Sequence, residues 1–352
     1  MNNPTTIRLT QFSHGAGCGC KIAPGVLDQI LRPSRNQNYP NLLVGYEQRD
    51  DAAVYLLDDN QCIISTTDFF MPIVDDPFDF GRIAAVNAIS DVYAMGGKPI
   101  MALGILGWPI DKIDPYWAGI VLEGAKCICA EAGIPLAGGH SIDSPEPIFG
   151  LSVNGLIARK KIKTNGAAQI GDLLYLTKPL GVGILTTAEK KSILKEEHRA
   201  LAQNSMLKLN RVGSVLAEFG EVHAMTDVTG FGLAGHLLEI CEASKVSARV
   251  DYVKLPLLTP DLDEYLLQQS TPGGTNRNWK SYGTKVKLKD DAYKWIVADP
   301  QTSGGLMVVV HPDGRRKVEE TLNEQGINAE PIGIIEPLTK TDHEVEYRVY
   351  VD

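Results

Sequence analysis

The stretch Asn87–Lys98, NAISDVYAMGGK, holds the end of a long helix and a polar stripe on an otherwise apolar surface. The apolar pattern predicts a helix over residues 79–95, which two glycines then end. Within it Asn87, Ser90 and Asp91 lie at positions i, i+3 and i+4, so they share one face. A helix that is apolar on most sides is buried. A buried carboxylate needs a metal ion or a hydrogen-bond network as its partner, so Asp91 is a candidate site residue.

Strands and a second helix surround this helix in the sequence. The second helix is expected over residues 116–132, where Gly133 ends it. The pattern predicts an α/β-type domain with a mixed sheet over residues 42–158. Its expected strands, chosen by their β-branched and aromatic composition, cover residues 53–57, 62–66, 101–106 and 148–158.

The basic stretch Arg159–Gly166 marks the boundary to a second α/β-type domain, expected over residues 168–352. The polar segment Ser270–Gly283 is long enough to suggest a functional or mobile loop. Residues 1–41 have little periodicity and are expected to form a flexible, glycine-rich segment. In the second domain we expect strands over residues 173–177, 222–225, 248–252 and 306–310, and helices from residue 184 and over 206–219, 232–243, 261–268 and 314–325.

The composition is that of a soluble globular protein, and 352 residues suit about two domains. Lys and Arg total 34 against 43 Asp and Glu, giving a net charge of −9. An acidic chain is a poor generic binder of nucleic acid. An anionic ligand would need a local cationic group or a bridging metal ion. Without a long apolar run or a signal peptide, we expect a cytosolic protein with reduced cysteines and no membrane partner.

Three further aspartates lie next to predicted strands. Asp50 and Asp51 come just before one strand, where adjacent carboxylates suit Mg²⁺, which takes hard oxygen ligands and leaves others to phosphates. Asp68 follows the next strand and precedes apolar residues. The plainer interpretation is a solvated acidic turn at residues 50–51 and a strand-ending turn at Asp68.

Two glycine-rich stretches could bind anions. Residues 138–141, Gly-Gly-His-Ser, could bring backbone N–H groups to an anion or could form an ordinary tight turn. Residues 230–235 begin a predicted helix, match G-x-G-x-x-G and are followed by Asp251, which resembles a dinucleotide-binding fingerprint. Asp227 precedes that motif, and its carboxylate would repel a pyrophosphate unless a cation lay between them.

The segment Ser13–Lys21, SHGAGCGCK, has three glycines in its first seven residues and reads as mobile or ligand-contacting rather than as a core element. Cys18 and Cys20 lack a second cysteine pair that would complete a zinc site. Lys21 favours the reactive thiolate form of a nearby cysteine and could itself bind phosphate. The residues alone leave three classes open: metal-assisted phosphate chemistry, a dinucleotide enzyme and a non-catalytic ligand carrier.

Taken together, seven blocks resemble the selenophosphate synthetase (selenide, water dikinase) family, within the aminoimidazole ribonucleotide synthetase-like superfamily. The cysteine segment is the block that points to selenium, since the aspartate and glycine blocks are shared across the superfamily. The blocks are residues 13–21 (SHGAGCGCK), 49–54 (RDDAAV), 66–72 (TTDFFMP), 87–98 (NAISDVYAMGGK), 137–143 (AGGHSID), 225–236 (MTDVTGFGLAGH) and 299–306 (DPQTSGGL).

The resemblance implies conversion of ATP, selenide and water to selenophosphate, AMP and phosphate, with Mg²⁺. It also implies a homodimer whose N-terminal domains form a barrel across the interface, a C-terminal α/β sandwich, and room for a selenium-delivery protein. Cys18 and Lys21 would be catalytic, and Asp51, Asp91 and Asp227 would hold Mg²⁺. The nucleotide would contact Lys21, Gln48, Arg49, Asp50, Asp68, Asp91, Gly139, His140 and Ser141.

Two alternatives remain beside this resemblance. One is a sister kinase or ATPase of the same superfamily, which would leave ADP as the final nucleotide. The other is a nucleotide-binding carrier of selenium or sulfur without turnover.

Overall fold

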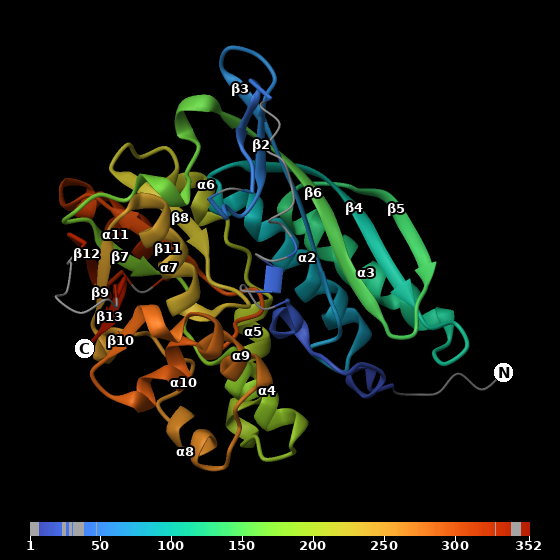
Figure 1. Cartoon of the computed structure of the whole chain (residues 1–352). Helices are drawn as coiled ribbons and strands as arrows, with labels where there is room; N and C mark the ends of the chain where they lie inside the picture. Colours follow the sequence, from blue (N-terminus) through green and yellow to red (C-terminus); the bar gives the residue numbers. More distant parts are fainter. Residues whose placement is uncertain are drawn as a thin grey trace.

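The helix expected over residues 79–95 is α2 (Pro77–Ala94), and it lies between two mixed β-sheets (Figure 1). The Asp76 side chain caps it by accepting a hydrogen bond from Asp79 N, and Pro77 occupies the first turn. Almost every residue of α2 after the first turn is buried. The computed structural model describes residues 7–22, 26–27, 30, 39–46, 48–327, 329–338 and 346–352.

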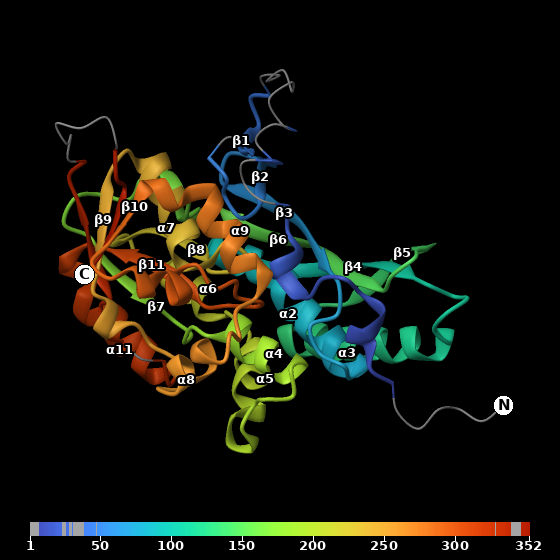
Figure 2. The same cartoon turned by 60° about the horizontal axis from the view of Figure 1, so that its bottom comes forward.

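The first sheet has six strands in the order β1-β2-β3-β6-β4-β5, with only β4 and β5 parallel. Helices α2 and α3 (Pro115–Ala132) cover one face of it (Figure 2). On the other face Tyr55, Phe69 and Ile100 are exposed. The strands are β1 (Leu42–Val44), β2 (Ala53–Leu56), β3 (Gln61–Phe70), β4 (Lys98–Trp108), β5 (Leu136–Asp143) and β6 (Ile148–Ala158).

The second sheet has seven strands in the order β10-β13-β9-β12-β7-β11-β8. All five residues of its strand β11 are buried, because both faces of the sheet are covered. Leu306, Val308 and Val310 pack toward α6 and α11, whereas Met307 and Val309 join the larger core. The strands are β7 (Leu173–Leu176), β8 (Val222–Asp227), β9 (Ser247–Val250), β10 (Val286–Leu288), β11 (Leu306–Val310), β12 (Gly333–Glu336) and β13 (Val349–Val351).

Around the second sheet, α5 (Arg199–Met206) and α10 (Lys294–Val297) were not expected, and two further segments differ from the prediction. The loop expected over residues 270–283 is wrong, because α9 occupies most of it and its polar Asn278 is buried, donating to the backbone oxygens of Gly230 and Ala298. The single helix expected over 206–219 is interrupted, because buried Asn210 donates to Ser90 Oγ and Gly304 O. The helices are α4 (Val182–Lys190), α5 (Arg199–Met206), α6 (Val212–Leu216), α7 (Gly232–Ser244), α8 (Leu262–Leu267), α9 (Gly273–Tyr282), α10 (Lys294–Val297) and α11 (Arg315–Glu324).

The segment 138–141, considered above as a turn or an anion-binding loop, is instead part of strand β5. Gly139 pairs with Gly104 of β4, and a side chain there would clash with the β4 backbone, with its Cβ 2.0 Å from Gly104 O. Within the described part of the chain, no helix has the length and apolar character needed to cross a membrane.

Candidate active site

A cavity of about 730 Å³ opens between the two sheets, beside α2. The ends of several elements meet there: β3 carries Asp68, α2 carries Asp91, and β8 ends in Asp227. The cavity therefore gathers charged side chains from both domains. Its lining includes Lys21, Arg49, Asp50, Asp51, Thr66, Asp68, Asp91, Asp227, Thr229, Phe231, His236 and Glu239.

Three of these carboxylates have raised pKa values. Burial raises the pKa of Asp51, Asp91 and Asp227, and the negative charge of Asp227 raises the pKa of both others further. Thr226 Oγ1 donates to Asp51 Oδ1 at 2.9 Å, and Thr66 Oγ1 donates to Asp91 Oδ2 at 2.5 Å. These hydroxyls orient the carboxylates without neutralising them.

The donor set fits Mg²⁺. The Oδ2 atoms of Asp51 and Asp227 are buried and have no hydrogen-bond partner among the described residues. A cation would satisfy both oxygens and offset the burial and the neighbouring negative charge that raise these pKa values. Among the described residues, no three acidic, histidine or cysteine side chains are placed so that they could hold a metal ion together. Mg²⁺ usually takes only one or two carboxylates and completes its shell with water and substrate phosphates, so an ion here would need phosphate ligands as well.

Lys21 supplies positive charge beside the acidic residues of the cavity. Its Nζ lies 3.2 Å from Asp68 Oδ2, and the side chain is 35% exposed. Burial opposes its charged form, but the negative charges of Asp68, Asp91 and Asp227 raise the pKa of Lys21 well above its usual value. Lys21 therefore carries a positive charge at neutral pH and lines the same cavity as these carboxylates.

Hydrogen bonds through Asn87 link Cys18 to Asp68, one of the acidic residues of the cavity. Its Sγ donates to Asn87 Oδ1 at 3.1 Å, while Asn87 Nδ2 donates to Asp68 Oδ2 at 2.8 Å. The backbone N–H of Ser303 also donates to Asn87 Oδ1, at 2.8 Å. The polar stripe of α2 thus places a thiol beside the Lys21–Asp68 pair.

The segment that carries Cys18 is more tightly packed than its composition suggests. Cys18 has no exposed surface and belongs to the core, so the expectation that this segment holds no core residue is wrong. The Cys18 backbone N–H donates to Thr302 Oγ1 at 3.1 Å. A Cβ on Gly230 would lie 2.5 Å from Cys18 O. The second domain therefore holds the cysteine against α2.

The loop Asp299–Gly305 provides that support. Asp299 Oδ2 accepts from Gly183 N at 3.0 Å and from Gln301 Nε2 at 2.8 Å, which fixes the loop to the start of α4. Burial raises the pKa of Asp299 to about 8. These hydrogen bonds of Asp299 therefore help to position Thr302 and Ser303 in the same loop.

Not every residue implied by the resemblance lies in the cavity. Lys21, Arg49, Asp50, Asp51, Asp68, Asp91 and Asp227 line it, and Cys18 lies behind it. Gln48 is exposed and is absent from the lining. Gly139, His140 and Ser141 are exposed on the edge strand β5 and likewise do not line it.

Other polar residues of the cavity escaped the sequence-based selection. Thr226 and Thr66 each orient a carboxylate. His236 and Glu239 lie one turn apart on α7 and face the cavity together. The sequence signal that could have identified them is their i, i+3 spacing on a mostly apolar helix. Asp91 was identified from a spacing of the same kind.

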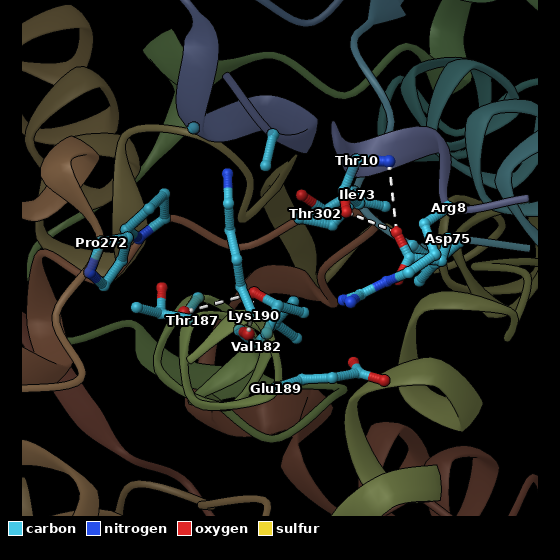
Figure 3. A pocket seen from close by; sticks show the side chains of 16 residues that line it. Arg8, Thr10, Ile73, Asp75, Val182, Thr187, Glu189, Lys190, Pro272 and Thr302 are labelled. Atoms are coloured by element: carbon cyan, nitrogen blue, oxygen red, sulfur yellow. Dashed lines mark hydrogen bonds and ion pairs between the residues drawn. The ribbon is translucent and has the colours of Figure 1, made fainter. Parts of the chain in front are cut away.

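A second, smaller cavity of about 90 Å³ lies beside the cysteine segment (Figure 3). Gly19 and Thr302 line it together with residues of α4. Figure 3 shows the Lys190 side chain extending from α4 into this space. Arg8 Nε donates to Asp75 Oδ2 at 2.7 Å at its edge. Among the described lining residues, none of the predicted site residues occurs.

Comparison with known proteins agrees with this two-domain arrangement. The family model for the N-terminal domain of AIR synthase related proteins matches residues 49–157, and the model for their C-terminal domain matches residues 169–346. A solved structure of thiamine-monophosphate kinase from Stenotrophomonas maltophilia is 20% identical, with a TM-score of 0.65 over 95% of this chain and 96% of its own. At that identity, the likeness shows the shared fold.

Two curated relatives are much closer in sequence. One from Aeromonas hydrophila, named selenide, water dikinase, is 58% identical over 336 residues, which is 95% of this chain and 97% of the relative. One from Pseudomonas putida with the same name is 55% identical over 347 residues, covering 98% of this chain and 99% of the relative. The second of these matches covers nearly the whole chain.

Proposed function

This chain belongs to the selenide, water dikinase family, and we propose that the acidic cavity between its two domains is where its reaction takes place. The enzyme makes selenophosphate from selenide, ATP and water, and it releases AMP and phosphate. The observation that carries the proposed location is the buried carboxylate group, which has two unpartnered oxygens and lines the same cavity as Lys21.

Pairs among Asp51, Asp91 and Asp227 would hold Mg²⁺ together with the phosphates of ATP. When bound there, Mg²⁺ supplies the positive charge that lets an acidic cavity accept a polyanion and stabilises charge on the transferring phosphoryl group. Asp68 accepts hydrogen bonds from Asn87 and keeps Lys21 oriented. Arg49 and Asp50 line the same cavity and would contact the nucleotide.

Lys21 would stabilise the negative charge of the phosphoryl group as it leaves ADP. Phosphoryl transfer needs positioning and charge stabilisation more than covalent chemistry. Its ammonium group lies on the side of the cavity where the cysteine segment approaches. Transfer of the γ-phosphoryl group to selenide would therefore occur between Lys21 and Cys18.

Cys18 would deliver or orient selenium through its sulfur. The support is its position behind the cavity, hydrogen-bonded to Asn87 and held by Thr302. Because the side chain is buried, selenium can reach it only when the segment moves or when a passage opens. This fits a segment that closes over the substrates and excludes water until both are present.

The chain would act as a homodimer. Strand β5 is an exposed edge, and the face of the first sheet that the helices leave uncovered carries exposed Tyr55, Phe69, Ile100 and Ile142. Joining two such sheets would cover both features. It would also give Gly139, His140 and Ser141 a route to a nucleotide, from the neighbouring subunit. A cytoplasmic location follows from the need for ATP, and a selenium-delivery protein would supply the second substrate.

The test is anaerobic incubation with ATP, Mg²⁺ and selenide, followed by nucleotide chromatography and ³¹P NMR. Selenide-dependent formation of AMP, phosphate and a selenium-coupled phosphorus signal is the expected result. ADP as the final nucleotide would instead indicate a sister kinase, and ATP binding without turnover would indicate a carrier. The same incubation with Asp227→Asn tests the site, since that variant should form no selenophosphate.

A further inference from the structure

Three residues of the cavity, Thr229, His236 and Glu239, have no part in holding ATP or Mg²⁺ in the arrangement above. All three are nine-tenths or more buried, yet all three line the cavity. Thr229 lies in the turn after β8, and the other two lie on the first turns of α7. They form a continuous chain of polar groups that ends at the cavity, which we call the Thr229–His236–Glu239 chain.

The geometry of this chain is that of a hydroxyl, a base and a group that orients the base. His236 Nε2 lies 3.3 Å from Thr229 Oγ1. His236 Nδ1 lies 3.0 Å from Glu239 Oε2, at an ion-pair distance but without hydrogen-bond alignment, so this buried nitrogen is left unsatisfied. Phe231 stacks on the imidazole with ring centroids 5.5 Å apart, which limits its rotation. Unsatisfied buried polar groups call for an explanation, and a catalytic role is one.

The reaction of the family contains a step that needs such a base. Transfer of a phosphoryl group to selenide uses an anionic nucleophile. Hydrolysis of the remaining ADP uses water, which is neutral and must lose a proton as it attacks phosphorus. A positioned histidine commonly accepts that kind of proton. Among the described residues that line the cavity, His236 is the one imidazole.

We propose that His236 acts as the general base for ADP hydrolysis, receiving the proton through the hydroxyl of Thr229. The water oxygen forms a bond to the β-phosphorus, and the bond from that phosphorus to the bridging oxygen breaks. Its electron pair stays on the α-phosphate of AMP. The water proton passes to Thr229 Oγ1 while the Thr229 hydroxyl proton passes to His236 Nε2, and Glu239 stabilises the resulting imidazolium.

This inference rests on the proposed function, and it separates the two halves of the reaction. Loss of the base should slow hydrolysis and leave selenide phosphorylation in place. His236→Gln should therefore accumulate ADP, with AMP formation slowed about 100-fold, the usual scale for a general base. Thr229→Val should behave in the same way, and Thr229→Ser should restore AMP formation because it restores the hydroxyl.

The experiment is single-turnover incubation of the full-length enzyme with ATP, Mg²⁺ and selenide, followed by chromatography of ADP and AMP. The matched control is His223→Gln, since His223 also faces a carboxylate, Asp172 Oδ2 at 2.8 Å, but does not line the cavity. It should keep the wild-type ratio. The ADP-to-AMP ratio does not depend on the fraction of folded protein, so partial misfolding of one variant does not hide the effect.

Two results would overturn the role of His236. Equal slowing of selenophosphate and AMP formation in His236→Gln would make the residue structural, and an unchanged ratio in Thr229→Val would remove the relay. Failure of the proposed function is distinguishable, because the wild-type enzyme itself would then stop at ADP or form no selenophosphate.

Discussion

Cys18 Sγ lies 3.1 Å from Asn87 Oδ1, and this hydrogen bond joins the N-terminal segment to the central helix α2. The same amide group donates to Asp68, which pairs with Lys21. One asparagine thus couples the sulfur, the cation and a carboxylate of the cavity. The distance also places the thiol at the back of the site rather than at its mouth.

Replacement of this thiol is the first test of its role. Cys18→Ser should abolish selenide-dependent AMP formation, because the hydroxyl lacks the nucleophilicity and polarisability of sulfur. It should leave the fold intact, since serine is no larger and can donate to Asn87 in the same way. Assays of AMP with circular dichroism as the folding control would check this. Full activity of the variant would show that the sulfur has no chemical role.

Lys21→Met keeps much of the side-chain length but removes the charge. Turnover should fall about 100-fold or more, because the cation faces the phosphates in a partly buried site. The melting temperature should change little, since the Lys21 side chain is 35% exposed and such pairs contribute little to stability. Steady-state rates and thermal unfolding measured on the same preparation would separate these effects. A large loss of stability would make Lys21 a structural residue instead.

Asp227→Asn should lose activity and should be more stable than the wild type in the absence of metal. In wild-type protein without metal, the burial of Asp51, Asp91 and Asp227 disfavours their charged forms and raises their pKa values, and the negative charge of Asp227 adds to this effect at Asp51 and Asp91. Removing one charge should raise the melting temperature in EDTA by about 2–4 °C, the shift expected for about 1 kcal/mol. Mg²⁺ with ATP should stabilise the wild type strongly and the variant weakly. Differential scanning fluorimetry in the two buffers would check both, and a lower melting temperature in EDTA would contradict this effect of burial and charge.

Asp299 gives a pH-dependent prediction away from the cavity. Burial raises its pKa to about 8 in the folded protein, against about 3.9 in an unfolded chain. The Asp299 carboxyl therefore makes its full contribution to the stability of the folded state below about pH 4. That contribution is lost as the pH rises through 8. Asp299→Asn should flatten the decline of the melting temperature between pH 5 and pH 8. Asp58→Asn is the control, because hydrogen bonds from Asn60 and Gln61 lower the pKa of that exposed carboxyl. Equal slopes for both variants would contradict burial as the cause.

Much of the fold could be predicted from the local sequence pattern. The wrong predictions can each be traced to a particular residue. Apolar periodicity located α2 because the helix is buried on nearly every side. The helix α9 was missed because its polar Asn278 looked solvent-exposed in sequence, whereas it bonds backbone oxygens in the interior. Asn210 ended a helix early for the same reason. The periodicity of apolar residues in a sequence does not show which polar residues form tertiary hydrogen bonds in the interior.

The candidate site, too, could be predicted from the sequence only in part. Aspartates beside strand ends were found because that position exposes a carboxylate to a shared edge. The G-x-G-x-x-G match at residues 230–235 gave no sign of the packing that Gly230 permits, which is the close approach of Cys18 O to its backbone. Contacts between segments as distant as Cys18 and Thr302 depend on the packing of two domains. No local pattern carries that information.

The most direct test of metal-bridged ATP binding in the acidic cavity is calorimetric titration of ATP into the protein with Mg²⁺ and with EDTA. We expect binding with Mg²⁺, none detectable with EDTA, and weak binding with Mg²⁺ in Asp51→Asn. ATP binding of equal strength in EDTA would contradict the proposal, because the buried carboxylates would then face the phosphates without a cation between them.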